Sequence, residues 1–330
     1  MGNSLSITGQ RLLAFAKDWE NAMIHTKLRG LLAFSLMSIC LSACGENAVQ
    51  TNKKTADATN ASASKSVAAC QDFKTIETQA IKGDAKSQYE LAKLFEEGIC
   101  VAQSRISATY WYGNAAKKDY ADAKARREAI LSALEESAKK GDANAQYDLA
   151  WMYHHGYGLK FDYPKAIEWY ERSAKQGQVQ AQYTLGEIYS EDMRIEQDLA
   201  KAKHWFEAAA KQGNAEAQNK LSTMYYKGNG IGQDYGQARY WAEQSANQGN
   251  SQGQVLLGWL YEKGYGVEQD YAKARYWYEK SAMQGNQKAQ DNLASIYYNG
   301  KGVPKDLKKA QYWSDKAMQQ GDCGGGTGCR

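Results

Sequence analysis

The chain has 330 residues, of which 41 are basic and 37 are acidic, so its formal net charge at pH 7 is +4. This near balance lacks the strong basic excess of a nucleic-acid-binding surface. With 30 glycines and 2 prolines, the composition suits helices that end at glycine-rich breaks.

Residues 1–43 carry the pattern of a targeting segment. Lys27 and Arg29 precede an apolar run over residues 31–40, and the run leads into Leu-Ser-Ala before Cys44. The run is too short to cross a bilayer. The segment resembles a bacterial lipoprotein signal peptide. This resemblance implies cleavage before Cys44 and a diacylglyceryl group on its thiol.

Two alternatives compete with the lipoprotein interpretation. The segment could be a short core helix with a chance Leu-Ser-Ala-Cys, and Met1-Gly2 with Ser6 fits a myristoylation pattern that needs a eukaryotic host. The flanking charges favour a signal peptide, although 43 residues is long for one and Met23 would give a more usual length. No aspartate follows Gly45, which in the family sense favours the outer membrane, facing the periplasm.

Residues 44–67 separate this segment from the rest of the chain. After Cys44 they are rich in Ala, Thr, Asn, Ser and Lys and contain no aromatic residue. Such a composition predicts a disordered tether, with an r.m.s. reach of roughly 25–30 Å. We expect the folded domain to occupy residues 68–320, followed by a Gly/Cys tail over 321–330.

A 36-residue period organises most of the folded domain. A leucine follows eight residues after the first glycine of each unit, and an aromatic residue follows twelve after it, so the two share one helix face. Such a period indicates a solenoid, in which each unit buries its apolar face only against its neighbours. The units carry variants of the motif G-x-A-x-A-Q-x-x-L-A/G and begin at Gly83, Gly141, Gly177, Gly213, Gly249 and Gly285.

Each unit also predicts a second helix, which we name helix B to distinguish it from the first, helix A. A glycine-rich break ends helix A, and an aspartate is then placed to cap helix B through free backbone N–H groups. Helix B carries an alanine and, three residues later, a tryptophan, as in Ala166 and Trp169. No strand is expected. The capping aspartates are Asp162, Asp198, Asp234, Asp270 and Asp306.

The period is disturbed at two places. The first two units are 58 residues apart, and we interpret the extra residues 119–140 as a degenerate repeat that has lost its interhelix loop and forms one longer helix. The third unit has Asp192-Met193-Arg194 where the others have loop glycines.

Over about residues 83–320 the combined pattern, A-x-A-Q-Y-x-L-G/A through K-A-x-x-W-Y, resembles the Sel-1-like repeat family, a tetratricopeptide-like class. The resemblance implies an all-α, right-handed superhelical solenoid that acts as a scaffold or adaptor. The leading hypothesis is therefore a non-enzymatic adaptor, lipid-anchored in the bacterial envelope, with a protein or peptide in its concave groove. We expect no cofactor, metal, nucleic acid or small-molecule substrate.

Four cysteines remain outside residues 1–44, and an even number in an exported chain suggests two disulfides. Cys70 precedes a helix that should run antiparallel to the helix before Cys100, which places both at the same end. Cys323 and Cys329 flank a glycine-rich stretch and can pair locally.

Catalytic patterns are weak. The adjacent His154 and His155 point about 100° apart on a helix, which does not suit a metal site. Two S-x-x-K matches, at residues 62–65 and 137–140, lie in the tether and in a repeat helix rather than in a rigid, buried cleft. A β-lactamase-like or cell-wall hydrolase stays open as an enzyme alternative, because some relatives of this repeat class have been described as β-lactamases. A surface-exposed binder of host protein is a third possibility.

The candidate binding groove consists of helix A positions that are not needed for packing. Offsets seven, ten and fourteen from the repeat glycine vary between units, as a binding surface requires. Trp151 and Trp259 are candidate anchors, because tryptophan is favoured at interfaces; the alternative is that they pack on helix B of the neighbour. Charged residues of both signs lie between the two tryptophans. This order suggests a partner segment with apolar ends and charges of both signs in its middle. The predicted groove residues are Asp148, Trp151, His155, Thr184, Glu187, Glu191, Lys220, Thr223, Lys227, Leu256, Trp259, Lys263, Asn292, Ser295 and Asn299.

Overall fold

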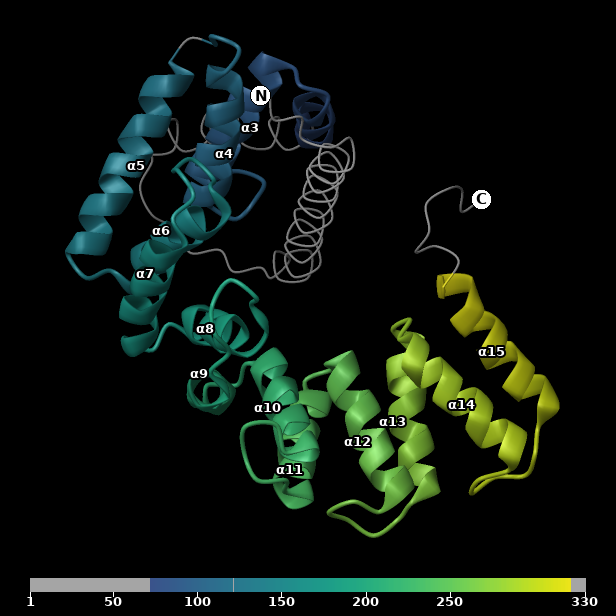
Figure 1. Ribbon diagram of the computed structural model, residues 1–330. Helices are drawn as coiled ribbons and strands as arrows, with labels where there is room; N and C mark the ends of the chain where they lie inside the picture. The colour runs from purple at the N-terminus through teal and green to yellow at the C-terminus, as the bar shows by residue number, and fades with distance from the viewer. Residues whose placement is uncertain (1–71, 121, 322–330) are drawn as a thin grey trace, which may run out of the picture. The chain divides into compact units, whose positions relative to one another are not determined.

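The computed structural model describes residues 72–120 and 122–321 (Figure 1). Every regular element in these residues is a helix, which confirms the predicted all-α repeat solenoid. No helix within these ranges has the length and apolar character needed to cross a membrane. The predicted signal segment, Cys44, the tether, Cys70, Cys323 and Cys329 lie outside the described residues.

The chain divides into two compact units within helix α5, after Leu131. The first contains a helical segment over residues 72–81, then α3 (Ala85–Glu97), α4 (Arg105–Ala116) and the start of α5 (Ala123–Lys139). The second contains the rest of α5 and five helix pairs. These are α6 (Ala143–His155) with α7 (Tyr163–Lys175), α8 (Val179–Glu191) with α9 (Leu199–Lys211), α10 (Ala215–Lys227) with α11 (Tyr235–Asn247), α12 (Ser251–Lys263) with α13 (Tyr271–Met283), and α14 (Gln287–Asn299) with α15 (Leu307–Gly321).

Each helix A packs against its own helix B, and α8, α10, α12 and α14 also pack against helix B of the preceding repeat. The leucine at offset eight is at most 1% exposed in every repeat, and the helix B alanine is fully buried in all but the last. Small alanines let the helices approach closely, while the leucines fill the space between them. From α6 to α15 the core is therefore a series of interfaces shared by neighbouring helices, as a solenoid requires.

Helix caps define the repeat boundaries. The aspartates predicted to cap helix B do so, as when Asp270 accepts a hydrogen bond from the backbone N–H of Lys273 at 2.9 Å. Helix α12 ends at Gly264 in the left-handed conformation. Two residues later Gly266 has φ of +67°, and an added Cβ would lie 2.4 Å from the carbonyl oxygen of Tyr235. Only glycine fits there, so this loop is fixed against the preceding repeat.

A ladder of glutamines links consecutive repeats. The motif glutamine at offset five is buried, and its amide donates to an alanine carbonyl of the preceding helix, as Gln218 does to Ala210 at 3.0 Å. Its own side-chain oxygen accepts from the glutamine that follows helix B, which for Gln218 is Gln248 at 2.8 Å. The same pair of bonds occurs at Gln146, Gln182 and Gln254.

The two irregular places have distinct structures. Residues 123–139 form one uninterrupted helix, α5. In repeat three the residues after α8 lack the glycine-capped turn, and Asp192 holds the loop by accepting bonds from the backbone and guanidinium of Arg194. Tyr163 on α7 also donates to Asp192. Ionic and aromatic contacts therefore take the place of the glycine turn.

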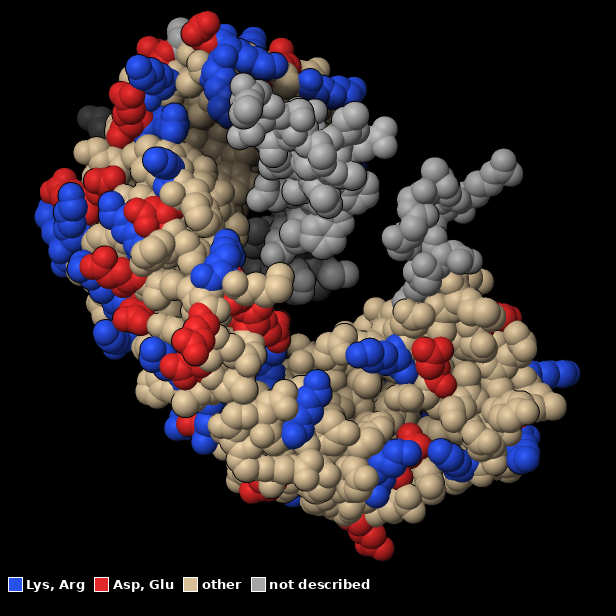
Figure 2. All heavy atoms as spheres, viewed as in Figure 1, with Lys and Arg blue, Asp and Glu red and all other residues tan. Residues whose placement is uncertain are grey.

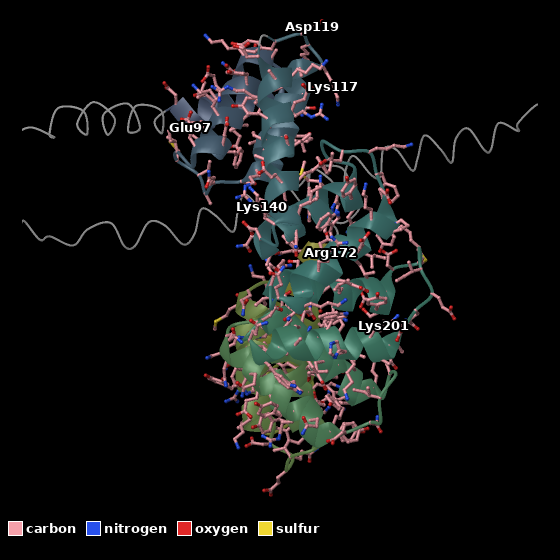
Figure 3. All side chains as sticks on the ribbon, turned by 90° about the vertical axis from the view of Figure 1, so that its left-hand side faces the viewer. Glu97, Lys117, Asp119, Lys140, Arg172 and Lys201 are labelled. Atoms are coloured by element: carbon pink, nitrogen blue, oxygen red, sulfur yellow. The ribbon has the colours of Figure 1, made fainter. Side chains whose placement is uncertain are left out.

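Charged side chains are dispersed over the surface. In the face of the molecule that Figure 2 shows, basic and acidic groups are interspersed. Figure 3 shows the side that carries Arg172 on α7 and Lys201 on α9. Arg172 bonds Glu168 at 2.5 Å and Lys201 bonds Asp198 at 3.3 Å. Exposed pairs of this kind contribute little stability, so they mainly keep the surface solvated.

Candidate functional site

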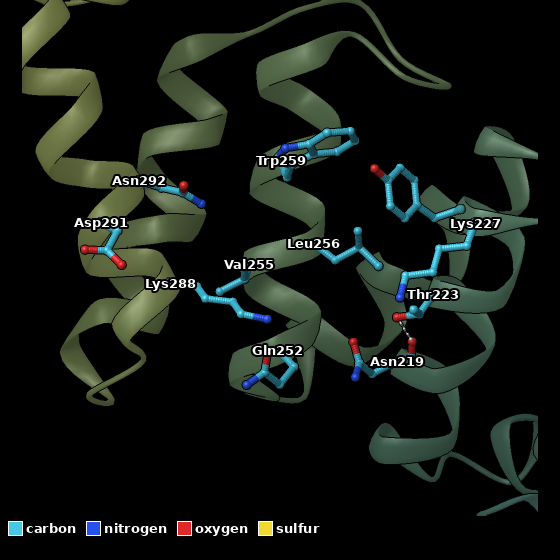
Figure 4. Close-up of a pocket in the computed structure, with 11 residues that line it drawn as sticks. Asn219, Thr223, Lys227, Gln252, Val255, Leu256, Trp259, Lys288, Asp291 and Asn292 are labelled. Carbon is cyan, nitrogen blue, oxygen red and sulfur yellow. Dashed lines mark hydrogen bonds between the residues drawn. The ribbon is translucent and has the colours of Figure 1, made fainter. Parts of the chain in front are cut away.

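An open hollow of about 480 Å³ lies on the surface formed by α10, α12 and α14 (Figure 4). These are the A helices of three consecutive repeats, and α10 contacts α12 directly. The residues that line the hollow are Asn219, Thr223, Tyr226, Lys227, Gln252, Val255, Leu256, Trp259, Lys288, Asp291 and Asn292.

Helical periodicity explains why these side chains face outward. On α10 the buried apolar positions are Ala217, Leu221 and Met224, which pack into the repeat core. Residues 219, 223, 226 and 227 fall on the opposite side of the same helix. The packing that builds the solenoid therefore also sets the surface that is free to vary.

Aromatic and aliphatic side chains form the floor of the hollow. Trp259 is half-buried, and its ring meets Tyr226 of α10 edge-on, with 4.8 Å between ring centroids. Its other aromatic neighbour is Tyr265 in the following loop, at 5.1 Å. Val255 and Leu256 are also half-buried beside it. These contacts hold Trp259 in one orientation while part of its surface stays open to solvent.

Polar groups surround this floor. Asn219 on α10, Gln252 on α12 and Asn292 on α14 present side-chain amides, which can both donate and accept hydrogen bonds. Lys227 and Lys288 contribute positive charge from the two outer helices. An apolar floor with a few polar groups at its rim is the usual composition of a ligand site.

Five of the predicted groove residues line this hollow, and they come from three repeats. They are Thr223, Lys227, Leu256, Trp259 and Asn292. The prediction missed positions three, six and thirteen after the repeat glycine. These positions share the same helix face, so extending the stripe at i, i+3 and i+7 spacing would have found them. The missed residues are Asn219, Tyr226, Gln252, Val255, Lys288 and Asp291.

The remaining predicted groove residues are not buried, but they lie outside the lining of the hollow. Asn299 bonds Ser295 on its own helix at 2.9 Å, and Lys263 pairs with Glu262 at 3.4 Å. The others are Asp148, Trp151, His155, Thr184, Glu187, Glu191 and Lys220.

Two sets of the predicted groove residues interact among themselves. Lys220 bonds Glu191 at 2.7 Å and lies 3.9 Å from Glu187, so these charges pair with one another. Trp151 stacks on His155 at 4.0 Å, and Tyr157 lies 5.2 Å from it. Trp151 therefore belongs to a separate aromatic cluster and does not line the hollow that contains Trp259.

The two histidines have structural surroundings. His155 is exposed and covers Trp151. His154 is half-buried, with Nε2 at 2.9 Å from the guanidinium of Arg194 and Nδ1 at 3.4 Å from the hydroxyl of Tyr170. Because arginine has no acceptor, His154 accepts through Nε2. This arrangement ties the irregular loop of repeat three to α6.

The same loop contains a carboxyl group with a perturbed pKa. Burial alone would raise the pKa of Asp192, but hydrogen bonds from Arg194 and Tyr163 outweigh it and hold that pKa well below its usual value of 3.8. Arg194 also lies over the Tyr163 ring at 4.2 Å. The perturbation is explained by a structural ion pair.

One of the two S-x-x-K matches lies within the described residues. Ser137 donates to Asp142 at 3.1 Å, whereas Lys140 bonds Glu136 at 2.5 Å, so the serine and lysine of this S-x-x-K match have different partners. Over residues 72–120 and 122–321, no three His, Cys, Asp or Glu side chains group as metal ligands would. The match at residues 62–65 lies outside the described residues. Cys100 is disulfide-bonded, and its pairing with Cys70 stays a prediction.

Sel1 repeats match six segments of the chain, and together these cover more than half of it. The matched residues are 85–120, 143–178, 179–214, 215–250, 251–286 and 287–322. The chain belongs to the Sel1 repeat family. Proteins of this family are in general scaffolds for protein interaction. The matches leave out the whole of α5, which agrees with its departure from the repeat pattern.

Solved structures of similar chains support the fold. A protective antigen present in uropathogenic Escherichia coli strains, which displays an SLR fold, is 31% identical with a TM-score of 0.57 over 76% of this chain and 56% of that one. A Sel1 repeat protein from Oxalobacter formigenes is 28% identical with a TM-score of 0.53 over 72% of this chain and 89% of that one.

A curated protein shares part of the repeat sequence. Chitin synthase regulatory factor 3 of Schizosaccharomyces pombe is 32% identical over 117 residues. The match spans 30% of this chain and 12% of the length of that relative. The two proteins are thus similar over a stretch of repeats and not over their whole lengths.

Proposed function

We propose that this Sel1 repeat protein is a non-enzymatic adaptor that binds a peptide segment of a partner protein in the hollow formed by α10, α12 and α14. The observation that supports this most strongly is the position of Trp259, a half-exposed aromatic anchor surrounded by side-chain amides and lysines from three repeats. Tryptophans in such settings contribute disproportionately to binding energy.

A crosslinking pull-down from envelope extracts, followed by alanine substitution, tests this proposal. Trp259→Ala should weaken capture of the partner by about 2 kcal/mol or more, because it removes the central anchor. Tyr276→Ala is a matched control, since Tyr276 is 48% exposed on helix B of the same repeat. If partner binding by folded Trp259→Ala protein equals that of the control variant, the hollow is not the binding site.

The enzyme alternative has a direct test. The purified protein without residues 1–43 is incubated with a chromogenic β-lactam and with peptidoglycan fragments. Turnover that persists through purification would replace the adaptor proposal with a hydrolase.

We further propose that Cys44 carries a lipid and anchors the adaptor in the bacterial envelope, at the outer membrane facing the periplasm. The basis is the basic residues, the apolar run and the Leu-Ser-Ala-Cys sequence. Cys44→Ser should abolish acylation and move the protein from the membrane to the soluble fraction. Unchanged acylation and fractionation would contradict the anchor. Protease treatment of intact cells separates a periplasmic address from the surface-exposed alternative.

A further inference from the structure

We propose that the hollow selects an extended, acidic peptide segment of five to six residues that carries one large apolar side chain. This inference rests on the proposed function and specifies its ligand. The partner is thus defined by its chemistry, and the argument depends on charge, hydrogen-bonding capacity and span.

Positive charge in the hollow is left without a counter-ion. Among the residues that the structure describes, no carboxylate lies within 4.0 Å of the amine of Lys227 or of Lys288. Lys220, one turn before the hollow residue Thr223, contrasts with them because Glu191 neutralises it at 2.7 Å. Asp291 is the one acidic residue of the lining, so the lining has a net positive charge. A ligand with carboxylates would balance it.

The side-chain amides are suited to a peptide backbone. Asn219, Gln252 and Asn292 lie on three successive helices. The hydrogen bond at this position on α10 runs from the Thr223 hydroxyl to the backbone carbonyl of Asn219 at 3.0 Å and does not use the Asn219 side-chain amide. Each amide can donate to a peptide carbonyl and accept from a peptide N–H. They can therefore hold a backbone without requiring particular side chains.

The size of the hollow sets the length of the segment. Helices that pack against each other are about 8–10 Å apart, and this spacing taken for both steps from α10 through α12 to α14 gives a span of roughly 16–20 Å. An extended chain rises about 3.3 Å per residue, which gives five to six residues over this span. Lys227 and Lys288 stand on opposite walls, with Leu256 and Val255 between them (Figure 4). Carboxylates near both ends of the segment would meet the two lysines.

The apolar floor requires one large side chain between these charges. Trp259, Tyr226 and Leu256 present aromatic and aliphatic surface at the centre of the hollow. Successive side chains of an extended peptide point to opposite sides, so one residue faces the floor while its neighbours face solvent or the rim. An aromatic or leucine residue flanked by acidic residues fits this pattern.

Selection from a display library of random heptapeptides with the protein lacking residues 1–43 tests the inference. Binding of an enriched, fluorescein-labelled peptide is then measured by anisotropy. Enrichment of Asp and Glu around an aromatic or aliphatic residue is expected. The double variant Lys227→Gln, Lys288→Gln should bind that peptide at least tenfold more weakly, and Asp291→Asn should bind it more tightly. Lys280→Gln, on helix α13, is the matched control and should leave affinity unchanged.

The outcomes separate this inference from the proposed function. Two results would overturn the acidic specificity and leave a peptide-binding adaptor. In the first, the enriched peptides need Trp259 but are not rich in acidic residues. In the second, their affinity is the same for the double lysine variant and for Lys280→Gln. If the protein enriches no peptide relative to the same selection with the Trp259→Ala variant, both the acidic specificity and the peptide-binding function are wrong. The melting temperature of each variant confirms that loss of binding does not reflect unfolding.

Discussion

At the scale of single residues, repeats with a common backbone differ in which side-chain pair closes helix A onto helix B. Where helix B carries a tyrosine, the residue sixteen positions earlier on helix A bonds its hydroxyl: Glu96 with Tyr112 at 2.6 Å, and Glu262 with Tyr278 at 3.1 Å. In repeat three Phe206 takes the tyrosine's place and packs against Gly186, where an added Cβ would lie 2.5 Å from the ring. These two tyrosine hydroxyls therefore have hydrogen-bond partners, and the Phe206 ring has the space that the glycine leaves, as interior packing requires.

The glutamine ladder yields a residue-scale prediction. Gln218→Ala removes the donor to Ala210 and the acceptor for Gln248, and leaves buried polar groups without partners. The free energy of unfolding should fall by about 1–3 kcal/mol, as measured by urea denaturation. Gln252→Ala, at an exposed position of the neighbouring helix A, should change it by less than about 0.5 kcal/mol. Equal effects of the two substitutions would contradict the ladder's role.

At the scale of elements, the loop after α8 shows how a repeat tolerates the loss of its glycine turn. The other described A helices of the six full repeats end at a glycine in the left-handed conformation, whereas α8 ends at Asp192 in an extended one. Asp192 then becomes the centre of bonds from Arg194 and from Tyr163 of the preceding repeat. Because a charged carboxylate is needed for these bonds, this element should be sensitive to acid.

The prediction for this loop follows from the lowered pKa of Asp192. A carboxyl group whose pKa is lower in the folded state stabilises the fold above its unfolded pKa and loses that contribution as the pH falls toward its folded pKa. Asp192→Asn should therefore lower the free energy of unfolding by about 1–3 kcal/mol at pH 7. The difference from wild type should shrink as the pH falls below 3.8. Denaturation at pH 7, 5 and 3 measures it.

Glu196→Gln is the matched control for this pH series, because Glu196 is an exposed carboxylate in the same loop. It should change stability little at any of the three pH values. A constant difference between wild type and Asp192→Asn across the series would show that the carboxylate charge is not what holds the loop.

At the scale of the whole molecule, stability is shared between neighbours along the chain. The buried cluster around Leu257 and Tyr278 draws residues from α11 through α15, so adjacent repeats share one core. In such a molecule each repeat adds its own stability and that of one interface. Loss of a terminal repeat should therefore shorten the solenoid while the remaining repeats stay folded.

Removal of residues 285–330 tests this expectation. The shortened protein should keep its helicity per residue roughly unchanged but unfold at a lower urea concentration, because α13 loses its packing against α14. It should also lose peptide binding, since Lys288 and Asn292 line the hollow. Circular dichroism and urea melts provide the measurement. Loss of helical signal throughout the shortened protein would contradict a solenoid in which each repeat is stabilised only by its neighbours.

The sequence alone determined the repeat architecture of this protein. Leucine at offset eight, the capping aspartates and the glycine breaks recur with the 36-residue period because each packing position is dictated by contact with the next identical unit. Helix type, caps and buried leucines could therefore be predicted. The position of Trp259 on the outer face of its helix could also be predicted, because packing specifies the opposite face of that helix.

Only the tertiary structure decided which variable positions act together. Lys220 lies at the same offset as the hollow residues Leu256 and Asn292, but Glu191 of the neighbouring repeat neutralises it. Trp151 and Trp259 also share an offset, yet the first is covered by His155 while the second lines the hollow. Periodicity specifies the face on which a side chain lies. Whether that side chain is free to bind depends on the charges and rings around it, some from the neighbouring repeat, as Glu191 is for Lys220, and some from the same helix and its following loop, as His155 and Tyr157 are for Trp151.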